Sequence, residues 1–242
     1  MSLLRMTFRC AALVGVLLAL ATLPLRAEGS PVVVELFTSQ GCSSCPPADA
    51  YLRELAAQDD VIALSYNVDY WDYLGWKDTL ASPAHAERQR AYARTLGLSG
   101  VYTPQIVVNG VVEGVGSKRD EIGAAIEAAS ALPVGISFTD RDEALTLDID
   151  AGEVPEKPAT LWLIRYAKEA RVEIGRGENR GRTIAYAHAV RELMPVGMWT
   201  GERMTMTLPK SDLLTRGFEG CVALLQAGDG GSILGAARTG GN

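Results

Sequence analysis

Short apolar runs alternate with helical patterns in the first half of the chain. Pro31–Thr38 and Val61–Val68 are β-branched runs of strand length bounded by turn residues, and they predict two buried strands. Between them, apolar residues spaced i, i+3, i+4 and i+7 predict one face of a helix. These residues are Ala48, Tyr51, Leu52 and Leu55. A strand–helix–strand unit indicates two parallel strands with a right-handed crossover.

The pattern continues with a polar helix, a hairpin and a final helix. Pro83–Leu96 is predicted to be helical, with Ser82 as its N-cap and Gly97 as its stop. Further along, Asn109-Gly110 is a hairpin signal. The elements predicted around it are the strands Gln105–Val108 and Val111–Gly114 and the helix Glu121–Ala129.

From Pro133 onward, short alternating or apolar runs recur between Gly, Pro, Asn and Asp residues. They are Val134–Thr139, Ala144–Asp150, Ala159–Tyr166, Arg171–Ile174, Thr183–Val190, Met204–Leu208, Cys221–Gln226 and Ile233–Ala236. Eight strands at this spacing predict an all-β, sandwich-like domain over residues 133–242, packed on an α/β domain over residues 28–132.

The first 27 residues have the pattern of a secretory signal peptide. Arg5 and Arg9 precede the uncharged run Cys10–Leu25, and cleavage is expected after Ala21 or Ala27. The apolar run is short of the roughly 20 residues that span a bilayer, so a permanent anchor is the weaker alternative. The sequence therefore predicts a periplasmic or secreted protein without stable membrane insertion after cleavage.

Composition and charge narrow the function classes. With 48% apolar and 21% charged residues among 242, the chain is typical of a globular protein. Cleavage after Ala27 removes three arginines and no acids, leaving 20 basic and 29 acidic residues and a net charge of −9. An acidic protein is repelled by phosphate backbones and anionic lipid, so neither nucleic acid nor a membrane surface is an expected partner.

The chemistry-bearing motif is Cys42-Ser-Ser-Cys45, at the junction of the first predicted strand and helix. A helix start holds two such cysteines close enough to bond, and the helix dipole favours a thiolate on the first. This arrangement predicts redox chemistry. Because prolines are comfortable only in the first helical turn, Pro46-Pro47 favours a helix start beyond Cys45, with Cys42 further from the dipole.

Four other interpretations of the cysteine pair compete. A structural disulfide is one, although so small a loop restrains little of the unfolded chain. A metal site needs more ligands than two thiolates, and His85 and His188 are isolated in the sequence. Covalent haem attachment requires a histidine where Pro46 stands. Delivery of copper or another soft metal through two thiolates remains an alternative.

Over residues 31–132, this order of elements and the Cys-x-x-Cys resemble the thioredoxin fold. The resemblance implies that Cys42 is the nucleophile, that Cys45 resolves the mixed disulfide, and that Pro104 is cis and faces the pair. It also implies a buried acid that accepts a proton, and Glu35 is the candidate, one residue further from Cys42 than usual. The alternative for Glu35 is a hydrogen-bonded strand residue. No cofactor is implied beyond a redox-active Cys42–Cys45 disulfide, and the expected partner is a thiol- or disulfide-bearing protein.

A helical insertion at about residues 69–100 departs from that fold. Parallel strands share an end, so the loop after Val68 emerges at the same sheet edge as Cys42. Its aromatic residues are expected either to line a substrate groove together with Thr103 or to form the core of the insertion. They are Tyr70, Trp71, Tyr73 and Trp76.

Three features of the second half have competing interpretations. Gly175–Arg191 contains arginines among glycines, which indicates either an anion site or, more simply, a tight hairpin turn. His188 is in phase with its strand neighbours and is expected to be packed there. Cys221, in an apolar run, is expected to be a buried, inert thiol.

Nearly the whole mature chain resembles the secreted thioredoxin-like family named domain of unknown function 1223. The residues that carry this resemblance are Phe37–Pro47, Asp69–Asp72, Gly75–Asp78, Arg88–Tyr92, Tyr102–Gln105 and Gly177–Thr183. The family has no assigned activity. The sequence thus predicts an exported thiol–disulfide oxidoreductase, with a non-catalytic binding module carrying a structural disulfide, or a soft-metal handling protein, as alternatives.

Overall fold

The computed structural model describes residues 30–213 and 217–239; the predicted signal peptide lies outside the described residues. Within these two ranges, no helix combines the length and the hydrophobicity that crossing a membrane requires. The elements are β1 (Val32–Thr38), α1 (Pro46–Leu55), β2 (Val61–Asn67), the 3-10 turn η1 (Asp72–Leu74), α2 (Pro83–Thr95), β3 (Gln105–Val108), β4 (Val112–Val115), α3 (Arg119–Glu127), β5 (Ile136–Arg141), β6 (Ala144–Ile149), β7 (Ala159–Glu173), β8 (Thr183–Trp199), β9 (Met204–Pro209), α4 (Lys210–Leu213), β10 (Gly220–Ala227) and β11 (Ile233–Arg238).

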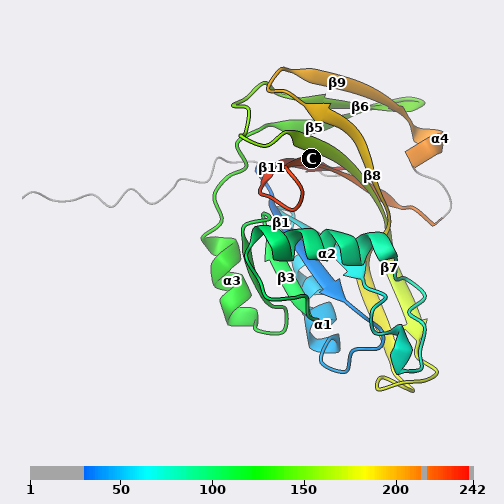
Figure 1. Cartoon of the computed structure of the whole chain (residues 1–242). Helices are drawn as coiled ribbons and strands as arrows, with labels where there is room; N and C mark the ends of the chain where they lie inside the picture. The colour runs from blue at the N-terminus through cyan, green and yellow to red at the C-terminus, as the bar shows by residue number, and fades with distance from the viewer. Residues whose placement is uncertain (1–29, 214–216, 240–242) are drawn as a thin grey trace, which may run out of the picture.

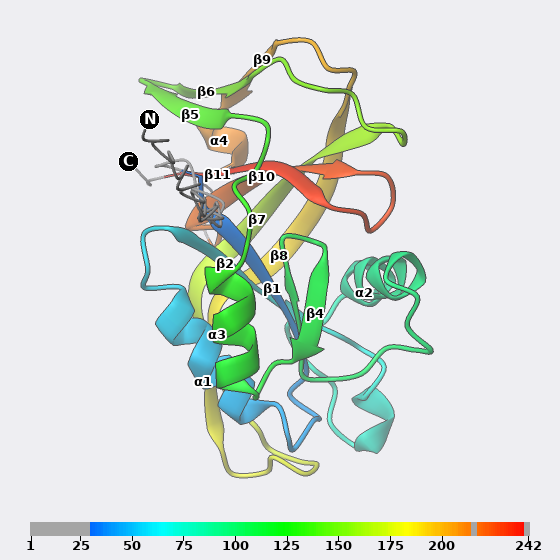
Figure 2. The same ribbon diagram turned by 90° about the vertical axis from the view of Figure 1, so that its left-hand side faces the viewer.

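One mixed sheet of eight strands runs through both halves of the sequence, in the order β11-β10-β7-β8-β2-β1-β3-β4 (Figures 1 and 2). The first half contributes the parallel pair β1–β2 and the antiparallel strands β3 and β4. The second half joins it through β8, whose Ala189 pairs in parallel with Ser65 of β2. Strands of both halves of the sequence therefore belong to one sheet. The division into two domains at residue 133 stays a prediction.

Strand β1 is buried on both faces. Val34 and Leu36 pack towards α1 and α3, whereas Val33 and Phe37 pack towards α2. Figure 2 shows α1 and α3 on one side of the sheet and α2 on the other. A strand covered on both faces reads as a continuous apolar run, which is why the sequence predicted it well.

A second, antiparallel sheet of three strands, β5-β6-β9, covers the far end of the main sheet. Leu147 and Ile149 of β6 pack against Leu161 of β7 and Leu225 of β10. The eight strands predicted after residue 133 correspond to seven in the structure, shared between two layers: three form this small sheet, and four extend the main one.

Strands β7 and β8 are longer than the sequence predicted, at 15 and 17 residues. The predicted break between Tyr166 and Arg171 does not occur, since β7 continues to Glu173 opposite Thr183 of β8. Lys168 and Glu169 are exposed there, so the apolar pattern ends while the backbone pairing continues. The result is a long hairpin whose tip reaches the other end of the molecule (Figure 2).

Two local predictions are confirmed. The hydroxyl of Ser82 accepts a hydrogen bond from the Ala84 amide at 3.3 Å and caps α2. Asn109 and Gly110 both adopt positive φ, at 48° and 71°, as a tight hairpin turn between β3 and β4 requires. A Cβ at Gly110 would also lie 2.4 Å from the Gly231 carbonyl, so a larger residue does not fit there.

Candidate functional site

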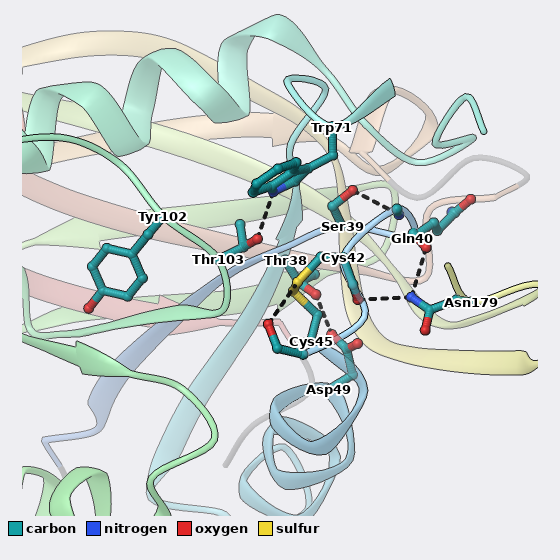
Figure 3. The surroundings of a disulfide bond; sticks show 12 residues. Thr38, Ser39, Gln40, Cys42, Cys45, Asp49, Trp71, Tyr102, Thr103 and Asn179 are labelled. Atoms are coloured by element: carbon teal, nitrogen blue, oxygen red, sulfur yellow. Dashed lines mark hydrogen bonds between the residues drawn. A yellow bond between two sulfur atoms is a disulfide. The ribbon is translucent and has the colours of Figure 1, made fainter. Parts of the chain in front are cut away.

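The two cysteines of the Cys-x-x-Cys motif are joined by a disulfide at the entry to α1 (Figure 3). The helix begins at Pro46, directly after its N-cap Cys45, so the predicted helix start beyond Cys45 is confirmed and Cys42 lies outside the helix. Cys45 is completely buried, whereas Cys42 keeps 6% of its surface exposed. The intervening Ser43 and Ser44 are exposed. Cys42 is therefore the more exposed residue of a pair that is buried overall.

Gln40, in the turn before the pair, is anchored by the insertion after β2. Its backbone amide donates to the Asp78 carboxylate at 2.8 Å. Its side-chain carbonyl accepts from the Trp76 indole at 2.8 Å and from the Thr79 amide at 3.3 Å. Trp76, predicted to line a substrate groove, thus lies against this turn, with its ring packed close to Gly175 of the β7–β8 hairpin.

The same turn is held from the other side by Asn179, at the tip of the β7–β8 hairpin. The side-chain amide of Asn179 donates to the carbonyls of Gln40 and Cys42, at 3.0 and 2.8 Å. Asn179 has no exposed surface. The glycine- and arginine-rich stretch is therefore a hairpin turn, and it contacts the cysteine motif directly (Figure 3).

Figure 3 shows Trp71 beside the disulfide, and two tyrosines contact Trp71. Trp71 stacks on Tyr73, contacts Tyr70, and donates from its indole to the Thr103 hydroxyl at 2.8 Å. Tyr73 is 76% exposed. Thr103 lies next to the disulfide in Figure 3 and is joined to Pro104 by a cis peptide bond. The loop after β2, which carries Trp71, and the segment before β3, which carries Thr103, thus meet beside the cysteine pair.

Asp49 is the buried acid nearest the disulfide in Figure 3. It is 2% exposed, and one carboxyl oxygen accepts from the Thr38 hydroxyl at 2.7 Å. Its other oxygen, Oδ2, has no hydrogen-bond partner in the described part of the chain. Burial raises the pKa of Asp49 to about 8; the Thr38 bond opposes this shift, and the charge of Asp78 adds to it. At neutral pH, Asp49 is therefore mostly protonated.

Glu35 lies on the opposite face of β1. It is completely buried, and Arg88 of α2 binds both of its oxygens, at 2.7 and 3.0 Å. The hydroxyl of Tyr92 donates to the same carboxylate, and Gln226 accepts from Arg88 at 2.9 Å. The acid that α1 brings to the disulfide is therefore Asp49. Glu35 is thus a hydrogen-bonded strand residue, as the alternative interpretation expected, and its proton-acceptor role stays a prediction.

The remaining predicted residues lie apart from the disulfide. Cys221 is buried, and desolvation raises the pKa of its thiol to about 12, as expected of an inert thiol. His188 is packed in β8, with Nδ1 2.9 Å from the Ala63 carbonyl. In residues 30–213 and 217–239, no group of three or more His, Cys, Asp or Glu side chains is arranged to hold a metal.

Asp49 and Asn179 were not predicted from the sequence. The sequence does contain a signal for Asp49. It lies next to Ala48 on the face of α1 that also carries Leu52, and an acid is costly to bury on such a face. Asn179 lies in the Gly177–Thr183 motif that carries the family resemblance, but an asparagine among glycines is typical of any exposed turn, so its contact with the cysteine motif could not be predicted.

Fold and site together define a mixed α/β protein with a disulfide-bonded Cys-x-x-Cys at a strand-to-helix junction. The chain belongs to the family described as "Protein of unknown function (DUF1223)", which matches residues 33–226. No curated protein matches the sequence.

Two solved structures are similar. The X-ray crystal structure of a protein from Agrobacterium tumefaciens has 40% sequence identity and a TM-score of 0.77, covering 89% of this chain and 97% of that one. HBP35 of Porphyromonas gingivalis has 15% identity and a TM-score of 0.56, covering 88% of this chain and 76% of that one. The second likeness concerns the fold alone.

Proposed function

We propose that this protein is an exported thiol–disulfide oxidoreductase with a thioredoxin-like fold, acting through Cys42 and Cys45 on protein thiols or disulfides. The observation that carries the proposal is the Cys42–Cys45 disulfide at the entry to α1, where Cys45 is completely buried and Cys42, at 6% exposed, is the more accessible of the two. Exchange requires one sulfur that a partner can reach and a second that reacts only within the site.

In the oxidised state, a partner thiolate attacks Cys42 Sγ, and the Cys42–Cys45 bond breaks with Cys45 leaving as a thiolate. Protonated Asp49 supplies the proton that Cys45 takes up, through the oxygen that has no other described hydrogen-bond partner. A second partner thiolate then attacks the partner sulfur of the mixed disulfide, and Cys42 leaves. The partner is oxidised by two electrons and the pair is reduced; the reverse sequence reduces a partner disulfide.

The surroundings of the pair favour a polypeptide partner. Tyr73 and Trp71 form a stacked, partly exposed aromatic surface whose Trp71 Cβ lies close to Gly41 in the turn before Cys42. Aromatic side chains of this kind contribute most of the binding energy at protein interfaces. A peptide held on this surface would have its own cysteine beside Cys42.

A second candidate function has one observation in its favour. Cys42 is only 6% exposed, as a fixed structural disulfide would be. In that case the scaffold is a non-catalytic binding module, and the aromatic surface or the second sheet contacts its partner without exchange.

Trapping distinguishes the two. In cells that export the full chain and make its native partners, Cys45→Ser is expected to accumulate partner adducts, because Cys42 can still attack but cannot release its partner. Cys42→Ser is expected to give roughly tenfold fewer adducts or none, since the remaining sulfur is covered. Adducts are counted on non-reducing gels and must disappear with reductant.

Cys221→Ser is the matched control, because that thiol is buried away from the pair, and it should not change adduct yield in the Cys45→Ser background. Equal yields from both motif variants contradict the assigned roles. No adducts from either variant would favour the binding module.

A further inference from the structure

We propose that Asn179 is a positioning residue for the Cys42–Cys45 pair, which holds Cys42 at the separation from Cys45 that closes the disulfide. This inference rests on the proposed function, because it assigns to the β7–β8 hairpin the task of setting the redox properties of that pair. It gives a role to the Gly177–Thr183 motif, which the exchange chemistry alone leaves unexplained.

The turn at the tip of the β7–β8 hairpin orients the Asn179 side chain. The Gly181 amide donates to the Ile174 carbonyl at 2.7 Å, and the Ile174 amide donates to the Arg182 carbonyl at 2.9 Å, so the turn is closed. Gly177 and Gly181 have φ of 76° and 80°, which a side chain would strain. Arg182 donates to the Asn179 side-chain carbonyl at 3.3 Å and fixes which way the amide points.

The Asn179 amide uses its two hydrogens on the two carbonyls that flank Gly41, those of Gln40 and Cys42. The Cys42 carbonyl also accepts from the Cys45 backbone amide at 3.3 Å. One carbonyl thus links the hairpin, the first cysteine and the start of α1. All of these groups are buried or nearly so, and a buried carbonyl without a donor is costly.

The expected consequence is a change in the effective concentration of one thiol relative to the other. With Asn179 in place, the reduced pair is held near bonding distance, and the disulfide re-forms readily. Without it, the turn before Cys42 gains freedom, and the equilibrium shifts towards the dithiol. We expect about a tenfold fall in the equilibrium constant for disulfide formation, which corresponds to about 30 mV towards less negative potential.

The test compares Asn179→Ala with the wild type, using the full mature chain equilibrated in glutathione buffers of stated ratio. Asn109→Ala is the matched control: Asn109 is also a buried hairpin asparagine, but it holds the Val33 amide and the Ser130 carbonyl. Val33 is near the start of β1, at the opposite end of that strand from the cysteine turn. Both variants should lose stability, and only Asn179→Ala should shift the potential.

An unchanged potential in folded Asn179→Ala overturns the inference, as does an equal shift in Asn109→Ala. If Asn179→Ala does not fold, Asn179→Ser replaces it; its hydroxyl is too short to reach both carbonyls, and it should shift the equilibrium at least twofold in the same direction. No shift in folded Asn179→Ser also overturns the inference. The proposed function is tested separately, by the potential of the wild type and by the trapping result. The Asn179 variants test only the difference in potential from the wild type.

Discussion

Replacing Arg88 by methionine is expected to lower the free energy of unfolding by about 3–5 kcal/mol, because the substitution leaves a buried carboxylate without its counter-charge. Glu35 is completely buried, and Arg88 contacts both of its oxygens while also donating to Gln226 and Tyr92. Urea unfolding of the oxidised protein at pH 7 measures the change.

Arg94→Met is the control on the same helix. Arg94 pairs with Glu87 and Asp229 at the surface, and its loss should have little effect. The double variant Arg88→Met/Glu35→Leu should recover much of the lost stability, since it removes both buried charges. A loss below about 1 kcal/mol in Arg88→Met would contradict this account of Glu35 as a structural charge.

Replacing Asp49 by asparagine is expected to act in the opposite direction and stabilise the protein at pH 7. Burial raises the pKa of Asp49 from 3.8 to about 8, so the folded state binds a proton that the unfolded state releases. The stabilising contribution of that proton is fully present below about pH 4 and is lost as the pH rises to about 8. Asparagine does not titrate, so the gain at pH 7 should be on the order of 4 kcal/mol.

The same substitution should slow exchange, because asparagine cannot supply a proton to Cys45. We expect the rate of reaction of the disulfide with a peptide thiol at pH 7 to fall on the order of 10- to 100-fold. Asp120→Asn, at an exposed first-turn position of α3, is the matched control and should change neither property. A destabilised Asp49→Asn, or one with wild-type exchange, would contradict the role given to Asp49.

The sequence predicted the elements in which the pattern of apolar and polar residues matches their burial in the fold. β1 and β2 are covered on both faces and are mostly apolar, and Ser82 and Asn109-Gly110 carry out local tasks that their side chains dictate. The full length of β7 and β8 could not be predicted, because their extensions are held by backbone pairing while most of their side chains are exposed or only partly buried.

Only the residues of the site that lie close together in the sequence could be predicted. Cys42 and Cys45 are close in the sequence and could be predicted as a pair. The sequence predicted Glu35 rather than Asp49 as the acid, because the face of β1 on which an acid lies depends on the alternation of side chains along the strand. Thr38 faces α1 and bonds to Asp49, whereas Glu35, an odd number of residues away, faces α2. Asn179 lies 137 residues from Cys42, and only the folded hairpin brings them together.

The reduction potential of the Cys42–Cys45 pair in the full mature chain tests the central claim most directly. An oxidoreductase needs a pair that its partners can oxidise or reduce, so the account predicts a value between about −270 and −120 mV, the range of exchange-active thioredoxin-like proteins. A value below about −300 mV would identify an inert structural disulfide and contradict the claim.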